Sequence, residues 1–515
     1  MSGDDGGLAP DAGPADAGPS DAGLTCGAGV APDAGVVVTS TGAVSGRLDA
    51  EIFSWLGIPY ASPPVGSLRW RPPEPAACWP DVRPGIAYGA ECPQQGSDGG
   101  VKGDEDCLTL NVFAKQGARG LPVMVWIHGG GNTQGSGSEL VYDGRELATR
   151  QAVVVVTFNY RLGALGFLVH GALNAESDAG VSGNYGILDQ QAALRWVKAN
   201  ASAFGGDPSR VMIFGESAGG QDTMLQLVAP GAKGLFSAAI AESGGTYSTT
   251  LAEAQSSMQS VVASVGCGSV ADPLSCLRSV SASSLAAVST AVGPLAMGLR
   301  YTPVIDGVVI PDHPLTLIQQ GKQHGVPVII GTNADETSRM VANVSTDAEY
   351  QAAVRAQYGT VRGNLVLAQY PSSRFSSPRV ALIAVTTDAT WTCPIRRFSR
   401  ALAATQQAPV FRYFFTWRSS GPAGAVIGST HGLEVPFVFR TFSAVSFVPD
   451  AAALDLADTM ESAWASFAAT GAPTTSLAWP RFPVGGDAAL ELGTPLASLT
   501  GVRTADCDFI DSLSP

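Results

Sequence analysis

The segment that decides the fold is "VMIFGESAGGQDTMLQLVA", residues 211–229. Four apolar residues of strand length lead into a serine between two glycines, and a run of helix formers follows. Glycine at 215 and 219 removes side chains that would collide where a strand reverses sharply into a helix, so Ser217 Oγ is exposed at the tip. The GxSxG spacing is weak evidence in a chain with 61 glycines, but its context predicts a nucleophilic serine.

Other apolar runs have the length of buried strands. They cover residues 123–127, 153–158, 238–241, 326–331 and 410–417. Continuous apolar runs are typical of strands buried on both faces of a parallel sheet. Residues 188–204 between them are rich in helix formers and place Leu188, Ala192 and Trp196 on one helical face. The alternation predicts an α/β fold with a mainly parallel central sheet flanked by helices.

A serine hydroxyl becomes a good nucleophile when a base takes its proton, and the chain has five histidines. His128 opens an HGGG run in which the glycine N–H groups are the more useful parts. His170 lies in a polar loop, and His313 and His324 lie in helical or loop stretches with no strand end immediately before them. His431 lies on the loop after the run at 410–417, where a sheet edge would present it. A lone loop histidine is more often structural, but elimination favours His431 as the base.

The third group must be a carboxylate that fixes the imidazole tautomer. Asp335 and Glu336 both follow the run at 326–331 and lie between Ser217 and His431 in the chain. The order serine, acid, histidine is that of α/β-hydrolases, but spacing alone does not separate the two acids.

An acyl-transfer enzyme also needs N–H donors for the developing oxyanion. "WIHGGGN", residues 126–132, supplies consecutive glycines after a strand, and the residue after the nucleophile supplies another N–H. Gly130, Gly131 and Ala218 are therefore the expected donors. The alternative is that the glycine run serves only flexibility. The presence of Ser217, His431 and an acid in the correct order argues against that alternative.

These residues together resemble the type-B carboxylesterase and cholinesterase family of α/β-hydrolases. The resemblance rests on residues 53–75, 105–113, 123–131, 159–168, 183–197, 204–220 and 431–439. It implies an α/β-hydrolase fold with inserted helical cap regions, Ser217 as nucleophile, Glu336 rather than Asp335 as acid, and His431 as base. It also implies that Ser243 in "AESGG" is a hydrogen-bonding partner behind these groups.

Eight cysteines suit four disulfides and an oxidising compartment, although eight buried thiols are the alternative. The resemblance implies the pairs Cys92 with Cys107, Cys267 with Cys276 and Cys393 with Cys507. Cys26 and Cys78 remain and are paired by default.

Departures from the family concern the substrate. Fourteen residues separate Cys92 from Cys107 and none is aromatic, so neither a choline-binding tryptophan nor an apolar lid is expected there. Short to medium or small aromatic esters are therefore expected, with a lipase or polyester hydrolase, or a non-catalytic cholinesterase-like binding protein, as alternatives. Asn132 and Arg339 stand where pocket aromatics are common, and Thr337 replaces a glycine. Arg339 is either a solvated surface charge or a partner for a substrate carboxylate.

Composition limits the remaining possibilities. Charged residues make up 14% of the chain and the net charge is −14, which disfavours nucleic acid as a partner. We expect residues 1–35, with six aspartates and no lysine or arginine, to be a disordered acidic tether before a catalytic domain at 36–515. We expect no transmembrane segment, metal or cofactor, and a secreted, periplasmic or surface-tethered protein whose leader is absent from the chain.

Overall fold

The computed structural model describes residue 26 and residues 35–96, 98–289 and 301–513. Within these residues, 13 strands form one large sheet in the order β1-β2-β3-β7-β9-β8-β10-β11-β14-β15-β16-β17, with β4 beside β2. The strands are β1 (Val36–Thr39), β2 (Gly42–Asp49), β3 (Ile52–Pro59), β4 (Arg83–Gly85), β7 (Thr109–Lys115), β8 (Leu121–Ile127), β9 (Val154–Phe158), β10 (Gly206–Glu216), β11 (Ala238–Glu242), β14 (Val328–Asn333), β15 (Val410–Phe415), β16 (Ala489–Leu492) and β17 (Ala497–Leu499). The predicted tether falls almost entirely outside the described residues.

The centre of the sheet is parallel. Every neighbouring pair from β9 through β8, β10, β11, β14 and β15 to β16 runs in the same direction. Toward both edges the strands pair antiparallel, except β4, which runs parallel to β2. The predicted mainly parallel sheet is confirmed, and each apolar run named above coincides with one of its strands.

Alternate residues of the central strands feed two separate cores. In β8, Val123, Val125 and Ile127 join one core while Met124 and Trp126 join the other. The first core is covered by α4 (Tyr185–Asn200), α5 (Ala218–Gln226), α9 (Pro314–Gln319) and α12 (Cys393–Thr405). The second is covered by α1 (Arg145–Arg150), α14 (Val435–Phe439) and α15 (Ala451–Thr470). Burial on both faces explains why the strands are continuously apolar.

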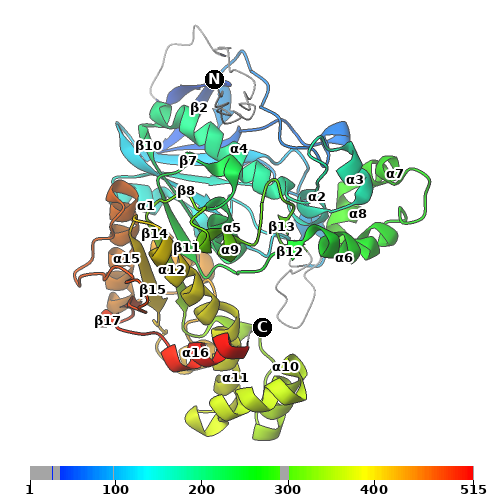
Figure 1. Cartoon of the computed structure of the whole chain (residues 1–515). Coiled ribbons are helices and arrows are strands. Elements are labelled where there is room, and N and C mark those ends of the chain that lie inside the picture. Colours follow the sequence, from blue (N-terminus) through cyan, green and yellow to red (C-terminus); the bar gives the residue numbers. More distant parts are fainter. Residues whose placement is uncertain (1–25, 27–34, 97, 290–300, 514–515) are drawn as a thin grey trace, which may run out of the picture.

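Two helical insertions lie in the connections between strands and extend away from the sheet (Figure 1). Between β11 and β14 lie α6 (Leu251–Ser264), α7 (Pro273–Ser279) and α8 (Ala282–Ala287), and between β14 and β15 lie α10 (Asp347–Gln369) and α11 (Pro378–Thr387). Both α6 and α10 begin with a capping box, in which a threonine and the glutamate three residues later satisfy each other's backbone N–H groups. The remaining α-helices are α2 (Gly163–Phe167), α3 (Gly171–Glu176), α13 (Pro422–Ile427) and α16 (Thr504–Leu513).

Four disulfides cross-link the chain. They join Cys92 to Cys107, Cys267 to Cys276 and Cys393 to Cys507, which are the pairs that the resemblance implies, and Cys26 to Cys78. Among the described residues, none of the helices is both long and apolar enough to cross a membrane.

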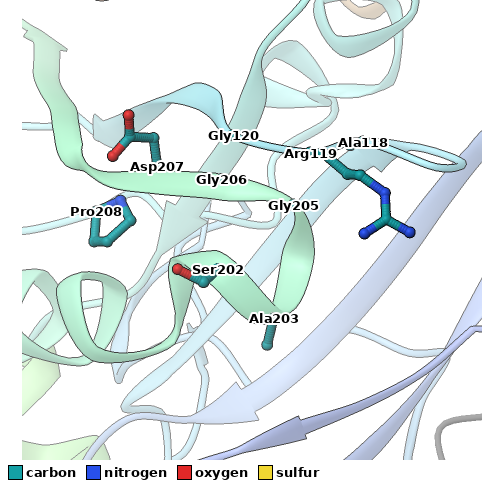
Figure 2. Close-up of a pocket in the computed structure, with 9 residues that line it drawn as sticks. All are labelled: Ala118, Arg119, Gly120, Ser202, Ala203, Gly205, Gly206, Asp207 and Pro208. Atoms are coloured by element: carbon teal, nitrogen blue, oxygen red, sulfur yellow. The ribbon is translucent and has the colours of Figure 1, made fainter.

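A surface hollow of about 680 Å³ is lined by Ala118–Gly120 just before β8, by residues just before β10 such as Ser202, and by the first residues of β10 (Figure 2). Its acidic side chain, Asp207, is already bonded to Ser209 and Arg210. The hollow is at the amino ends of two parallel strands. Ligands of such sheets bind at the carboxyl ends of the strands, which lie at the opposite edge from this hollow.

Candidate active site

Ser217 occupies the sharp turn between β10 and α5. Its backbone has φ 60° and ψ −121°, a conformation that a non-glycine residue rarely adopts. A Cβ atom at Gly219 would lie 1.9 Å from the carbonyl oxygen of Ile127 at the end of β8, so only glycine fits there. The turn is fixed further by the Ser217 N–H, which donates to the carbonyl of Glu242 over 3.0 Å.

Three predicted side chains meet at the carboxyl ends of β10, β14 and β15. Ser217 Oγ lies 2.8 Å from His431 Nε2, and His431 Nδ1 lies 2.6 Å from Glu336 Oε2. The other carboxylate oxygen of Glu336 accepts a 2.7 Å hydrogen bond from the N–H of Asn333. Such an arrangement can transfer the serine proton to the imidazole while the carboxylate holds the ring.

The two neighbouring acids have separate surroundings. Asp335 Oδ2 accepts a 2.9 Å hydrogen bond from the N–H of Ser429 and lies 2.8 Å from the guanidinium of Arg418. The structure therefore places Glu336, and not Asp335, against His431. Because adjacent side chains leave the backbone in different directions, spacing in the sequence could not make this distinction.

The glycine loop after β8 packs beside the nucleophile. Gly130 has φ 105° and Gly131 has φ 65°, both in the left-handed region that favours glycine. A Cβ atom at Gly129 would lie 3.1 Å from Ser217 Cβ, which shows how closely this loop approaches the serine. Ala218, the first residue of α5, has its N–H among the helix's unpaired first donors.

Asn132 ends this loop with φ 57° and is 2% exposed. Its Oδ1 accepts a 3.2 Å hydrogen bond from the Tyr160 hydroxyl, and its carbonyl accepts one of 2.7 Å from the N–H of Gly163. These contacts hold the residue within the loop, and a contact with substrate stays a prediction. Arg339, by contrast, is exposed at the end of the 3-10 helix η6 (Glu336–Arg339), so its role toward an anionic substrate also stays a prediction.

His128 has a structural environment. Its ring stacks on Tyr160 with centroids 4.3 Å apart, and Nδ1 lies 2.9 Å from the carbonyl oxygen of Gly129. Burial lowers its pKa to about 4, so the ring is neutral near neutral pH. These contacts give His128 a place in the packing of the loop, and the role of the glycines of the HGGG run stays a prediction.

Glu216 was not predicted from the sequence, although it precedes the serine. Its Oε1 lies 3.2 Å from His431 Nε2, the same nitrogen that faces Ser217. Burial raises the pKa of Glu216 to about 7, the His431 charge opposes the rise, and Glu336 adds to it. Burial lowers the pKa of His431, but Glu216 and Glu336 outweigh that effect and raise the pKa above its ordinary value.

Ser243 lies behind these groups. It is fully buried just after β11, and its Oγ donates to Glu434 Oε1 over 3.4 Å. Glu434 in turn accepts a hydrogen bond from the Asn333 amide, and Asn333 is the residue whose N–H holds Glu336. Ser243 thus reaches Glu336 indirectly, through the Glu434 carboxylate and then Asn333, whose side chain and backbone N–H make the two remaining hydrogen bonds. Among the described residues, no group of three or more His, Cys, Asp or Glu side chains is placed to hold a metal ion.

Comparisons with known proteins found a family model, several relatives and solved structures that are similar to this chain. The family model described as "Carboxylesterase family" matches residues 33–510. The para-nitrobenzyl esterase of Bacillus subtilis (strain 168) is 38% identical over 87% of this chain and 92% of its own length. The fumonisin B1 esterase of Sphingopyxis macrogoltabida is 37% identical over 86% and 84%, and the cholinesterase of Mus musculus is 33% identical over 92% and 86%. A solved PNB esterase superposes with a TM-score of 0.80 at 34% identity, covering 93% of this chain and 100% of its own.

Proposed function

This chain belongs to the carboxylesterase family and hydrolyses carboxylic esters, and we propose that it does so through a covalent acyl-enzyme formed on Ser217. The observation that carries the proposal is the continuous contact from Ser217 Oγ through His431 to Glu336. The resting geometry already has the hydrogen bonds that nucleophile activation requires.

In the first half of the reaction, His431 Nε2 takes the serine proton as Oγ attacks the ester carbonyl carbon. Glu336 holds Nδ1–H and stabilises the imidazolium that forms. The N–H groups of Gly130, Gly131 and Ala218 donate to the oxyanion, and the imidazolium then protonates the leaving alcohol oxygen.

In the second half, His431 Nε2 removes a proton from water, and the hydroxide formed attacks the acyl carbon. The same N–H groups hold the second oxyanion. The bond between the acyl carbon and Ser217 Oγ then breaks, Oγ regains its proton from His431, and the carboxylic acid leaves.

The proposed substrates are short to medium acyl esters or small aromatic esters. The segment between Cys92 and Cys107 supports this, because it forms a small hairpin of β5 (Gln94–Gln95) and β6 (Val101–Lys102) instead of an apolar helix. Gln94 pins the hairpin by accepting from the Gly135 N–H over 2.7 Å and donating to the Gly135 carbonyl over 2.9 Å. A relative named para-nitrobenzyl esterase fits the small aromatic class.

The test uses p-nitrophenyl esters of increasing acyl length. We expect kcat/KM to be highest for short to medium chains and a Ser217→Ala variant to lose nearly all turnover. Ser512→Ala, at an exposed serine on α16, is the matched control and should keep full activity. A preference for long chains would contradict the substrate class, and full activity of Ser217→Ala would refute the mechanism.

We also propose that the protein works in an oxidising compartment, whether secreted, periplasmic or tethered to a surface. Four disulfides support this, because reducing compartments rarely preserve them. Thiol labelling of protein trapped directly from cell fractions tests it. Labelling of all eight cysteines in the native host would contradict the proposal.

A further inference from the structure

A π-helical segment, η8 (Asp388–Thr392), joins α11 to α12 beside the candidate active site. A π-turn holds one more residue than an α-turn and is frequently found at functional sites. An added residue rotates the following side chains by about 100° around the helix axis, so the segment sets which residue faces inward. Here the residue that faces the site is Trp391.

Trp391 contacts the proposed base directly. Its ring centroid lies 5.0 Å from that of His431 with an angle of 48° between the planes, and the side chain is 1% exposed. Its indole N–H donates a 3.0 Å hydrogen bond to the carbonyl of Ser243. Ser243 follows Glu242, whose carbonyl accepts from the Ser217 N–H. The indole is thus held at a defined angle between the base and the backbone that fixes the nucleophile.

The π-helical segment is held firmly on its far side. Asp388 is fully buried, accepts a 3.0 Å hydrogen bond from the Tyr370 hydroxyl and lies 3.2 Å from the guanidinium of Arg503. At the end of α11, the Thr386 hydroxyl lies 2.6 Å from that of Thr337, the residue directly after Glu336. The threonine that departs from the family's glycine therefore ties the acid's own turn to α11, the helix that leads directly into the segment with Trp391.

We infer that Trp391 is a positioning residue for ester hydrolysis, whose indole holds the His431 ring toward Ser217 and stabilises the imidazolium formed when Ser217 is deprotonated. This inference rests on the proposed function of Ser217 and His431. The indole stabilises the imidazolium more than the neutral imidazole, because a cation near an aromatic ring is attracted by the ring's negative face. This attraction is strongest where water is excluded. An ordinary core tryptophan would lower stability when replaced, without moving the titration of the base.

Three charged side chains face His431 in addition to the uncharged Trp391. Glu216 from the end of β10, Glu336 from η6 and Glu434 from the loop before α14 all favour its cation. Trp391 adds an uncharged contact from η8, which is independent of these carboxylates. Its removal should therefore change the titration of His431 while leaving all three acids in place.

The test compares pH profiles of kcat/KM for p-nitrophenyl acetate. For Trp391→Leu we expect kcat to fall about tenfold with KM changed less than about twofold, since the lost contact acts in the transition state. We expect the acid limb to move about one unit to lower pH, because the cation of His431 loses its ring contact. Trp391→Phe keeps an aromatic face and should shift the limb by less than half as much.

Trp479→Leu is the matched control. Trp479 is 8% exposed and its indole N–H donates to the carbonyl of Arg412 over 3.0 Å, so its loss imitates the packing defect away from His431. A Trp391→Leu profile with an unmoved acid limb, or one matched by Trp479→Leu, would overturn the inference. Ser217→Ala measured in parallel separates the two proposals. Activity retained there removes the proposed function, whereas an inactive Ser217→Ala with an unmoved Trp391→Leu limb removes this inference alone.

Discussion

Replacing Glu242 by glutamine should stabilise the protein at alkaline pH. Glu242 is fully buried at the end of β11, and its Oε1 accepts a 2.8 Å hydrogen bond from the indole N–H of Trp464. Its other carboxylate oxygen has no hydrogen-bond partner among the described residues. Burial raises the pKa of Glu242 to about 8, the Trp464 hydrogen bond opposes the rise, and the Glu216 charge adds to it.

The sign follows from proton binding. Because the pKa is higher in the folded chain than the 4.5 of a free glutamate, the folded state keeps a proton that the unfolded state releases. Stability contributed by Glu242 therefore falls as pH rises from 4.5 to about 8 and is constant outside that interval. Each pH unit corresponds to about 1.4 kcal/mol, which gives at most roughly 5 kcal/mol across the interval. Glutamine does not titrate and keeps an acceptor for Trp464.

The assay is urea unfolding of the native chain and Glu242→Gln between about pH 5 and about pH 8. We expect the variant's advantage in free energy of unfolding to grow with pH by about 1 kcal/mol per unit. Glu146→Gln, at an exposed position on α1, is the control and should give a curve parallel to that of the native chain. Parallel curves for Glu242→Gln would refute the reasoning, because a neutral buried acid would then have no energetic consequence.

Three further changes have defined outcomes. Glu336→Gln should reduce kcat for p-nitrophenyl acetate about 10⁴-fold, because the imidazole would lose the carboxylate that sets its tautomer. A loss below tenfold in steady-state assays would argue against that role. Glu216→Gln should move the acid limb of kcat/KM to lower pH, because the Glu216 carboxylate raises the pKa of His431, and a limb at unchanged pH would contradict this coupling. Arg161→Met should destabilise the fold by about 3–5 kcal/mol in urea unfolding, because it leaves Asp189, now 2.7 Å from the guanidinium and fully buried, without its ion-pair partner. Unchanged unfolding of Arg161→Met would show that Asp189 is neutral in the folded state.

The central sheet was predictable because its strands are buried on both faces. A short continuous apolar run is enough to identify a strand of this kind, as at residues 123–127 and 211–214, so no distant contact is needed to recognise it. The antiparallel edge was missed. In β2, "GAVSGRLD", three buried residues are followed by half-exposed and exposed ones, and glycines interrupt the pattern. An edge strand of this kind is recognisable mainly by the partner it pairs with.

The site residues also differ in whether a local pattern or a distant contact defines them, and only the former could be predicted. Ser217 can be identified from the sequence of the turn that surrounds it, which is a local feature. Trp391 meets His431 across 40 residues of chain, and neither the π-turn nor the direction of the indole is encoded in a local pattern. Glu216 is adjacent to the serine, yet the contact of its side chain could not be predicted, because its partner, His431, lies more than 200 residues away in the chain.

The order of the site residues along the chain is a consequence of the sheet. β10, β11, β14 and β15 are successive parallel neighbours, so the loops that follow β10, β14 and β15 open at one edge. Each of these loops carries one member of the set Ser217, Glu336 and His431. The helical insertions lie in the connections between these strands, where added length leaves the strand ends in place. The sheet therefore fixes the positions of the three groups proposed to cleave the ester, while the insertions can change the substrate without moving those groups.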